Sequence, residues 1–332
     1  MTTQTYPVPE PGCYVPAITF FDPKTDKLDL DSQKKYFSYL STTGLKGLVV
    51  LGTNAETFLL SREERRVLLQ TARAAVPPRF PIIAGVSGHS TSQVIEYIQD
   101  AAQAGADYTL LLPCAYFGKQ TTPAVVKKFY RQVARASPIP IILYNFPAVC
   151  NGLDLDSEII TEITNENPNV VGVKLTCGSV AKIARLAATF SPSRFAVFGG
   201  QSDFLLGGLA VGSAGCIAAF ANIFPKSVAR IFDLWAAGKQ QDALALQKVL
   251  SLAESPTKAG IANTKYAAAY VTAPLAGIEG AVESLKPREP YEAPAEAAKA
   301  NIRRIMDPIK HLESGRSGKS SSAGSAEYRA RI

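Results

Sequence analysis

The sequence predicts an α/β fold, namely a (β/α)8 TIM barrel followed by a C-terminal helical extension. Short apolar β-rich runs alternate with helical patterns at even intervals through the first two thirds of the chain, which indicates a parallel sheet. Eight such runs are present, and eight is the number of strands that closes this kind of barrel. After residue 222 only helical patterns remain, which predicts the extension.

The expected strands are nearly continuous apolar runs, as in a parallel sheet that is buried on both faces. They cover 14–20, 46–52, 80–86, 106–113, 139–145, 169–175, 195–200 and 214–220. An open, doubly wound sheet is the alternative arrangement. However, the glycine-rich dinucleotide fingerprint that follows the first strand of many such sheets is missing here.

The segments between the strands have the apolar spacing of helices. The expected helices cover 31–43, 61–75, 91–104, 122–136, 156–166, 178–189, 202–211, 225–237, 240–254, 258–271 and 296–310. Ser61 and Glu64 have the spacing of a capping box. The chain is therefore divided into an N-terminal arm, the barrel, the helical extension and a Ser/Gly-rich tail that is expected to be disordered, over residues 1–11, 12–238, 239–312 and 313–332.

Composition and charge limit the classes of function. Of the 332 residues, 47% are hydrophobic and 19% are charged, which is typical of a globular protein. The formal charge is +7, but part of the excess lies in the tail and the rest forms no basic stripe with interleaved aromatics. Nucleic-acid binding is therefore not expected. Membrane insertion is not expected either, because no apolar run is long enough to span a bilayer.

Cysteines and histidines give no sign of a metal site. The five cysteines are scattered, and the two histidines, His89 and His311, lie far apart in the sequence. Without a cluster at ligand spacing, neither a disulfide framework nor a metal site is expected. The first residues show no secretory signal and no Arg-rich amphipathic presequence, so the cytoplasm is the expected location. Lys258 and Lys265 are expected to be solvated helix charges.

Lys174 is the first candidate for chemistry, because active sites of these barrels lie at the C-terminal ends of the strands. It ends an apolar run in which alternation places Val171 and Val173 on the opposite face. If the valines face the helices, Lys174 points into the barrel mouth. Burial disfavours the charged form of a lysine, and a neutral amine forms a Schiff base with a ketone. The alternative is a strand-end lysine that reaches solvent or pairs with a carboxylate.

Two other strand ends offer partners for this lysine. Tyr144 ends the preceding strand, and neighbouring strands about 4.8 Å apart bring their terminal side chains together. A phenol beside an imine can act as a general acid and base. Residues 52–56, Gly-Thr-Asn-Ala-Glu, offer a hydroxyl, an amide and backbone N–H groups for a carboxylate. By itself such a stretch is also typical of an ordinary turn.

Together these motifs make the chain resemble the dihydrodipicolinate synthase/N-acetylneuraminate lyase family of class I, pyruvate-dependent aldolases, over residues 12–310. The family's GTTGE-like loop is similar to residues 52–56. Its Tyr-Asn-x-Pro motif is similar to residues 144–147, and its Gly-x-Lys strand to residues 172–174.

The resemblance implies a role for each candidate residue. Lys174 would form the imine with the pyruvate moiety, Tyr144 would shuttle protons to the aldol hydroxyl, and Thr53 would assist Tyr144. Thr53 and Asn54 would also hold the pyruvate carboxylate.

The resemblance extends to the rest of the pocket and to assembly. Gly200 and Ile217 match positions that line the pocket through their backbone. The covalent lysine imine would take the place of a cofactor, and no metal would be needed. The partners would be a small keto-acid substrate and further copies of the chain, usually in a homotetramer.

The sequence departs from the family at two positions. Dihydrodipicolinate synthases usually carry an arginine where this chain has Val149, and an apolar side chain cannot bind a carboxylate in the bidentate, charge-assisted way. The family's Pro-x-Tyr tyrosine is replaced by Ala115. Tyr116, the next residue, is the candidate substitute and a candidate for substrate binding, although its strand parity is opposite.

Two subfamilies look closer, the 4-hydroxy-2-oxoglutarate aldolases and the fungal 2-keto-3-deoxy sugar-acid aldolases, on Asn54 and the patterns SPIPIILYNFP, GLDLD, PNVVGVK and KLTCG. KLTCG and GGQSDF lean toward the sugar-acid aldolases. The resemblance therefore implies cleavage of a 2-keto-4-hydroxy acid to pyruvate and an aldehyde. One alternative is condensation of pyruvate with aspartate semialdehyde, which Val149 disfavours. Another is a catalytically silent barrel that binds a keto acid, which Ala55 and Ala115 leave open.

Overall fold

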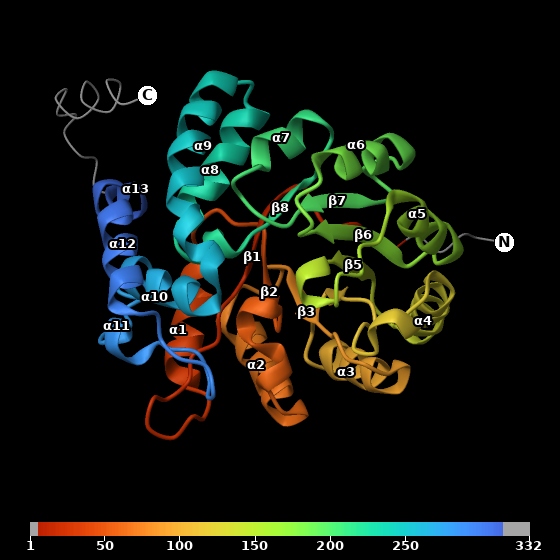
Figure 1. Ribbon diagram of the computed structural model, residues 1–332, viewed down its shortest axis with the longest axis horizontal. Helices are drawn as coiled ribbons and strands as arrows, with labels where there is room; N and C mark the ends of the chain where they lie inside the picture. The colour runs from red at the N-terminus through yellow and green to blue at the C-terminus, as the bar shows by residue number, and fades with distance from the viewer. Residues whose placement is uncertain (1–5, 315–332) are drawn as a thin grey trace.

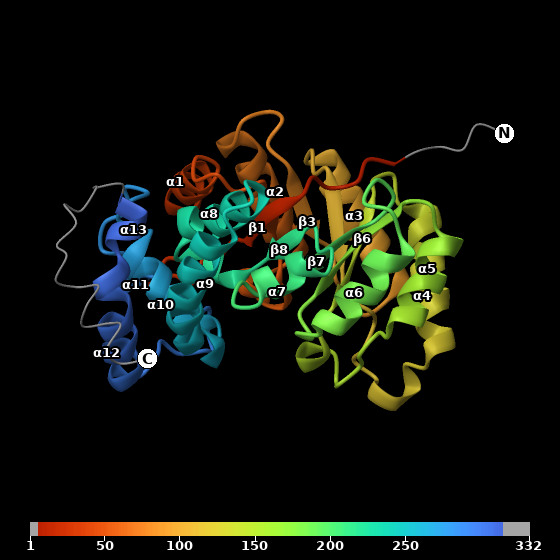
Figure 2. The ribbon, with the colours of Figure 1, turned by 90° about the horizontal axis from the view of Figure 1, so that it is seen from above.

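The computed structural model describes residues 6–314 of the chain. Eight parallel strands form a closed barrel in which each strand pairs with the next and β8 pairs with β1. Helices surround the barrel, and the last helices of the chain lie together on one side of it (Figures 1 and 2). The predicted TIM barrel with C-terminal helices is therefore confirmed.

Every residue of the eight strands is buried, as expected where helices cover the outer face and side chains fill the interior. The strands are β1 (Gly12–Pro16), β2 (Gly47–Val50), β3 (Ile82–Gly85), β4 (Tyr108–Leu111), β5 (Ile141–Asn145), β6 (Val170–Leu175), β7 (Ala196–Gly199) and β8 (Gly215–Ile217).

The helices around the barrel agree closely with the predicted ranges. They are α1 (Leu30–Leu40), α2 (Arg62–Ala75), α3 (Thr91–Gln103), α4 (Pro123–Ala136), α5 (Ser157–Glu166), α6 (Val180–Thr189), α7 (Leu205–Ala210) and α8 (Pro225–Ala236). The predicted capping box is confirmed, because Ser61 Oγ accepts from the Glu64 N–H at 3.2 Å and Glu64 accepts from the Ser61 N–H at 2.8 Å.

The chain continues after the barrel in α9 (Gln240–Glu254), α10 (Ile261–Val271), α11 (Ala281–Ser284), α12 (Glu296–Met306) and α13 (His311–Ser314). Glu313, the first residue of the predicted tail, is buried and accepts hydrogen bonds from Lys226 and Ser227 of α8. The rest of the predicted tail from residue 315, and residues 1–5 of the predicted arm, lie outside the described residues. Within residues 6–314, none of the helices has the length and apolarity needed to cross a membrane.

The first strand ends earlier than the sequence predicts, at Pro16 instead of residue 20. Beyond it, buried side chains accept the backbone hydrogen bonds that a neighbouring strand would otherwise accept. The Ile18 N–H donates to Asn222 Oδ1 at 3.2 Å, and the Phe20 N–H donates to Gln33 Oε1 at 2.9 Å. The apolar run therefore predicts correctly that these residues are buried, but it does not show where the strand ends.

A bulge in β6 corrects the predicted facing of its valines. Ile141 pairs with Val170 but Ile142 pairs with Gly172, so β6 has one extra residue at Val171. Val171 consequently packs inside the barrel, whereas Val173 packs between the barrel and the helices. The prediction that both valines share a face is wrong. Because Val173 faces outward, the next residue still faces the interior, as predicted.

Large side chains fill the barrel interior below its C-terminal mouth. The interior cluster includes Tyr14, Val49, Ile83, Leu110, Ile142, Val171, Phe198 and Ile217, each at most 2% exposed. The Tyr14 and Phe198 rings meet edge to face, with their centroids 5.4 Å apart. The barrel is thus a packed core that supports the strand ends from beneath.

Candidate active site

Three predicted site residues come together at the C-terminal ends of the strands. Tyr144 in β5 and Lys174 in β6 are direct partners in the strand register. Lys174 Nζ lies 4.2 Å from the centre of the Tyr144 ring, and the Tyr144 hydroxyl lies 3.3 Å from Thr53 Oγ1. The phenol therefore contacts both the amine and the threonine hydroxyl.

Lys174 differs from the other buried lysines in its surroundings. Lys174, Lys182 and Lys265 are each at most 4% exposed. Lys182 Nζ lies 2.5 Å from Asp154 Oδ1, and Lys265 Nζ lies 2.5 Å from Glu56 Oε1. Within residues 6–314, no carboxylate lies within ion-pair distance of Lys174. A buried amine without a counter-ion suits a nucleophile better than a structural charge.

Thr53 begins a turn that the barrel holds in place. The turn (Thr53–Ala55) follows Gly52, and the Glu56 N–H closes it by donating to the Thr53 carbonyl at 3.0 Å. Thr19 Oγ1 donates to the Ala55 carbonyl at 2.9 Å. Asn54 lies in the same turn, so the predicted carboxylate-binding groups follow directly after the end of β2.

Gly200 and Ile217 lie at the ends of β7 and β8, as the sequence predicts. A Cβ atom at Gly200 would lie only 2.1 Å from Thr176 Oγ1, so this close approach of two loops requires glycine. Ile217 is fully buried in the interior cluster, in register with Tyr14 of β1. Both positions are buried and offer no reactive side chain.

Tyr116 lies apart from the three residues at the mouth. Its side chain is 68% exposed and its ring contacts His89 and Phe117, whereas Ala115 is buried. Asn151 holds this loop by donating to the carbonyl oxygens of Ala115 and Tyr116. Ala115 and Tyr116 therefore face opposite ways, as the sequence predicts. The role of Tyr116 in substrate binding stays a prediction.

The loop that contains Gly200 is held by a carboxylate that the sequence analysis missed. Glu254, in the last turn of α9, accepts from Ser202 Oγ at 2.5 Å and from the Ser202 N–H at 3.3 Å. Gln247 donates to the Ser202 carbonyl at 2.9 Å. Burial raises the pKa of Glu254 to about 7, with the Asp203 charge adding to the rise and the Ser202 hydrogen bonds opposing it.

This pKa predicts a pH-dependent difference between the wild-type protein and the Glu254→Gln variant. The pKa of Glu254 is higher in the folded state than its ordinary value of 4.5. The carboxyl therefore stabilises the fold fully at pH values below 4.5, and this stabilisation is lost as the pH rises through about 7. Between pH 5 and pH 8, we expect the free energy of unfolding of the wild type to fall by roughly 1–3 kcal/mol more than that of the variant. Urea unfolding at both pH values measures this, and parallel changes in the two proteins would contradict it.

Lys265 is a second residue that the sequence analysis misplaced. It is fully buried, so the expectation of a solvated helix charge is wrong for it. The reason is that α10 carries buried residues around its whole circumference, including Thr264, Tyr266 and Ala267. Lys258 is exposed, as expected, and pairs with Asp203.

Comparison with known proteins places these observations in a family. The sequence model described as the Dihydrodipicolinate synthetase family matches residues 11–308. The chain is 62% identical, over 93% of its length and 98% of the relative, to a "Putative 4-hydroxy-2-oxoglutarate aldolase, mitochondrial" from Coccidioides immitis. It is 37% identical, over 77% of its length and 85% of the relative, to an "L-threo-3-deoxy-hexylosonate aldolase" from Aspergillus niger.

A solved structure is similar over the same extent. It is a putative dihydrodipicolinate synthase family protein from Coccidioides immitis, with a TM-score of 0.88 and 59% identity, and the match covers 93% of this chain and 98% of that one. The resemblance inferred from the three sequence motifs is therefore confirmed. Neither the condensation with aspartate semialdehyde nor the silent barrel is favoured by these relatives.

The expected cytoplasmic location is corrected by the same comparison. The relative that is 62% identical is named as a mitochondrial protein, which points to mitochondria instead. The expectation rested on the absence of a recognisable leader pattern in the first residues. Such patterns are compositional and loosely specified, so they carry little weight against a relative of this similarity.

The relatives also define the kind of enzyme. The chain is a carbon–carbon lyase of the class I aldolase type, in which a lysine Schiff base with pyruvate serves in place of an external cofactor. On the match of the family model over residues 11–308, and on these identities, the chain belongs to the dihydrodipicolinate synthetase family.

Proposed function

We propose that this enzyme cleaves a 2-keto-4-hydroxy acid to pyruvate and an aldehyde, with Lys174 as the residue that forms the imine. The contact of Tyr144 with both the Lys174 amine and the Thr53 hydroxyl carries the proposal. An imine formed on Lys174 would lie beside a phenol that has a second hydroxyl as its hydrogen-bond partner. This is the arrangement that retro-aldol chemistry needs.

The reaction follows from these positions. The Lys174 amine attacks the C2 ketone, and loss of water gives the imine. The imine takes up a proton and becomes an iminium ion. Tyr144 accepts the proton of the C4 hydroxyl and passes its own proton through Thr53 to water, the C3–C4 bond breaks, and its electron pair moves into the iminium ion to form a neutral enamine. The aldehyde leaves, C3 of the enamine takes up a proton, and water hydrolyses the imine to release pyruvate and restore Lys174.

The other predicted site residues bind the pyruvate half. Thr53 and Asn54 offer a hydroxyl, an amide and backbone N–H groups to the C1 carboxylate, at the end of β2. Gly200 and Ile217, which follow or end β7 and β8, would line the pocket through their backbone, as the family resemblance suggests. We place Tyr116 at the outer rim of the mouth, where a 68% exposed ring would meet only the distal end of a substrate.

The loops around the mouth favour an uncharged aldehyde half. The loops after β2 to β8 cover residues 51–61, 86–90, 112–122, 146–156, 176–179, 200–204 and 218–224. In these loops the basic side chains are His89 and Lys119, and the loop after β1, residues 17–29, adds Lys24 and Lys27. All four are exposed. Val149 adds an apolar surface that is 44% exposed. These loops therefore contribute no buried cation of their own for a second carboxylate, and the buried Arg65 of α2 already donates to the carbonyls of Thr57 and Ser87. The hydroxyls of a sugar acid need no cation.

We accordingly propose a 2-keto-3-deoxy sugar acid as the substrate. The second candidate is 4-hydroxy-2-oxoglutarate, because the relative that is 62% identical bears that name. Pyruvate release measured with both compounds tests the choice. A higher kcat/KM for the sugar acid supports the proposal, and a higher kcat/KM for 4-hydroxy-2-oxoglutarate supports the second candidate. Pyruvate binding without release of pyruvate from either compound would overturn both.

We further propose that the enzyme assembles as a homotetramer in mitochondria. The family resemblance suggests the tetramer, and the name of the similar fungal relative suggests the compartment. Three aromatic side chains, Phe58, Tyr116 and Phe117, are each more than half exposed, which is a surface that assembly would cover. Light scattering coupled to size-exclusion chromatography measures the mass, and a single-chain mass would contradict the tetramer.

A further inference from the structure

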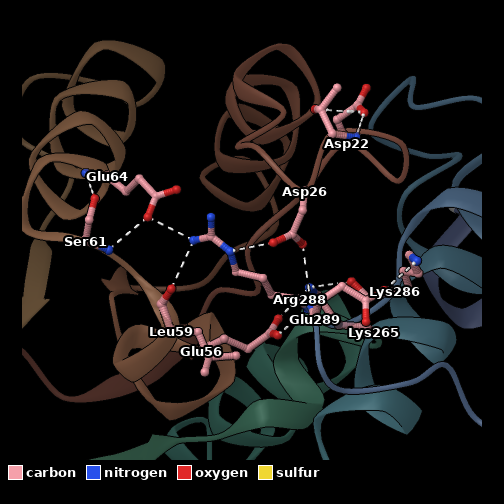
Figure 3. Close-up of polar contacts among 11 residues, drawn as sticks. Asp22, Asp26, Glu56, Leu59, Ser61, Glu64, Lys265, Lys286, Arg288 and Glu289 are labelled. Carbon is pink, nitrogen blue, oxygen red and sulfur yellow. Dashed lines mark hydrogen bonds and ion pairs between the residues drawn. The ribbon is translucent and has the colours of Figure 1, made fainter.

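A fully buried ion pair connects the turn that contains Thr53 to the C-terminal helices. Glu56 Oε1 lies 2.5 Å from Lys265 Nζ of α10, and their side chains are 2% and 0% exposed. The second oxygen of Glu56 accepts from the Arg288 N–H at 2.7 Å, and Lys265 also donates to the Lys286 carbonyl at 2.8 Å. Figure 3 shows the Glu56 carboxylate reaching this cluster.

The backbone at Glu56 needs this support. Its φ angle is 57°, in the left-handed region that side-chain-bearing residues rarely adopt. The Glu56 N–H closes the turn onto the Thr53 carbonyl, and the Glu56 carbonyl accepts from the Leu59 N–H at 2.8 Å. The residue therefore joins two successive turns. Its side-chain contacts hold a conformation that the backbone alone disfavours.

Arg288 closes the outer side of the cluster. Its guanidinium contacts Asp26 at 3.1 Å, Glu64 at 2.8 Å and the Leu59 carbonyl at 3.0 Å. In Figure 3 it lies between the two carboxylates. The Phe21 ring covers the cluster, with Lys265 Nζ 4.6 Å and the Arg288 guanidinium carbon 5.1 Å from its centre. The pair is thus enclosed by protein on several sides.

Such an ion pair is better suited to fixing geometry than to adding stability. The loss of solvation of two buried charges offsets much of their attraction, so similarly sized uncharged residues often give equal stability. What uncharged residues lose is the fixed direction of the carboxylate, and with it the position of the turn. Thr53 lies three residues before Glu56, and its hydroxyl must lie within hydrogen-bond distance of Tyr144.

We infer that Glu56 and Lys265 are positioning residues, which hold the Thr53 hydroxyl against Tyr144 from the C-terminal helices. The inference rests on the proposed role of Thr53 in the proton relay. It assigns to α10 a part in the reaction, although α10 contributes no group to the mouth. Misplacing a catalytic group by about 1 Å can cost on the order of 100-fold in rate.

The test is a double-mutant cycle between Lys265→Met and Thr53→Val, measured as kcat for retro-aldol cleavage. We expect Lys265→Met to lower kcat by roughly 10- to 100-fold. In the Thr53→Val variant, adding Lys265→Met should lower kcat little further, because the hydroxyl that Lys265 positions is already absent. If Lys265→Met leaves an unpaired Glu56 that prevents folding, the uncharged pair Glu56→Gln/Lys265→Met replaces it in the cycle.

Lys182→Met is the matched control. Lys182 is also buried and also lies 2.5 Å from a carboxylate, that of Asp154, but it does not contact the Thr53 turn. Asp154 also accepts from Asn145, the residue after Tyr144, so Lys182 is connected to the site through β5 and not through the Thr53 turn. Any effect of Lys182→Met on kcat should therefore persist undiminished in the Thr53→Val background. A general loss of packing would make both lysine variants behave alike.

The outcomes separate this inference from the proposed function. The inference would be overturned if the double variant Thr53→Val/Lys265→Met lost kcat by the product of the two single losses. A wild-type kcat for Lys265→Met would overturn it too. A wild-type kcat for Thr53→Val would overturn it as well. In each variant, borohydride trapping of pyruvate on Lys174 reports independently on the imine. Trapping is expected to persist in all of them, and its absence in the wild type would instead contradict the proposed function.

Discussion

Replacing Lys174 with alanine is expected to abolish covalent capture of pyruvate and to lower kcat by at least about 10,000-fold. The alanine cannot form an imine, so the electrons of the C3–C4 bond have no acceptor. A loss of this size corresponds to more than about 5 kcal/mol of transition-state stabilisation. The measurements are the mass of the protein after borohydride reduction with pyruvate, and the rate of pyruvate release from the keto acid.

The same experiment contains its own controls. Lys182 and Lys265 are as buried as Lys174 but are paired with carboxylates, so neither should carry the adduct. Peptide mapping of the reduced wild-type protein should therefore find pyruvate on Lys174 alone. An adduct on another lysine, or a Lys174→Ala variant with wild-type activity, would exclude the proposed chemistry.

Replacing Tyr144 with phenylalanine is expected to lower kcat by about 100- to 10,000-fold, the usual contribution of a general acid–base group. The ring remains, so its contact with the Lys174 amine is kept, while the hydroxyl that contacts Thr53 is lost. Imine formation uses the Lys174 amine itself, so pyruvate should still be trapped by borohydride. The loss should therefore appear in the cleavage step.

Two measurements distinguish this outcome from a folding defect. The free energy of unfolding of Tyr144→Phe should stay close to that of the wild type, because the hydroxyl makes one side-chain contact at 3.3 Å. Single-turnover rates should show the slow step after imine formation. If Tyr144→Phe cleaves the keto acid at the wild-type rate, another group must take the C4 proton.

Much of the fold could be predicted from the sequence because its signals are local. The strands are short apolar runs and the barrel helices have one apolar face, so their order and number follow from periodicity alone. The predictions failed where side chains from distant segments act. The N–H groups of Ile18 and Phe20 donate to the side chains of Asn222 and Gln33. A single-residue bulge reverses the facing of Val171. No local pattern encodes either feature.

The candidate site divides in the same way. Lys174 and Tyr144 could be predicted from the sequence because adjacent parallel strands end at the same edge of the sheet. Residues that end successive strands therefore lie close together. The Glu56–Lys265 pair joins residues 209 positions apart, and Glu254 meets Ser202 across 52 positions. Charged residues in a helical pattern are normally solvated, so the sequence gives no reason to bury them. Tertiary packing alone reveals these supporting groups.

The packed interior of the barrel sets the order in which the two products leave. Among the described residues, Tyr14 and Phe198 fill the core below the strand ends, so no passage runs through the barrel interior beneath Lys174. In the proposed reaction the keto half of the substrate would be tethered at Lys174 above this core, with the aldehyde half on its solvent side. The aldehyde must therefore depart first, and pyruvate can follow only after water has entered the space that the aldehyde leaves behind.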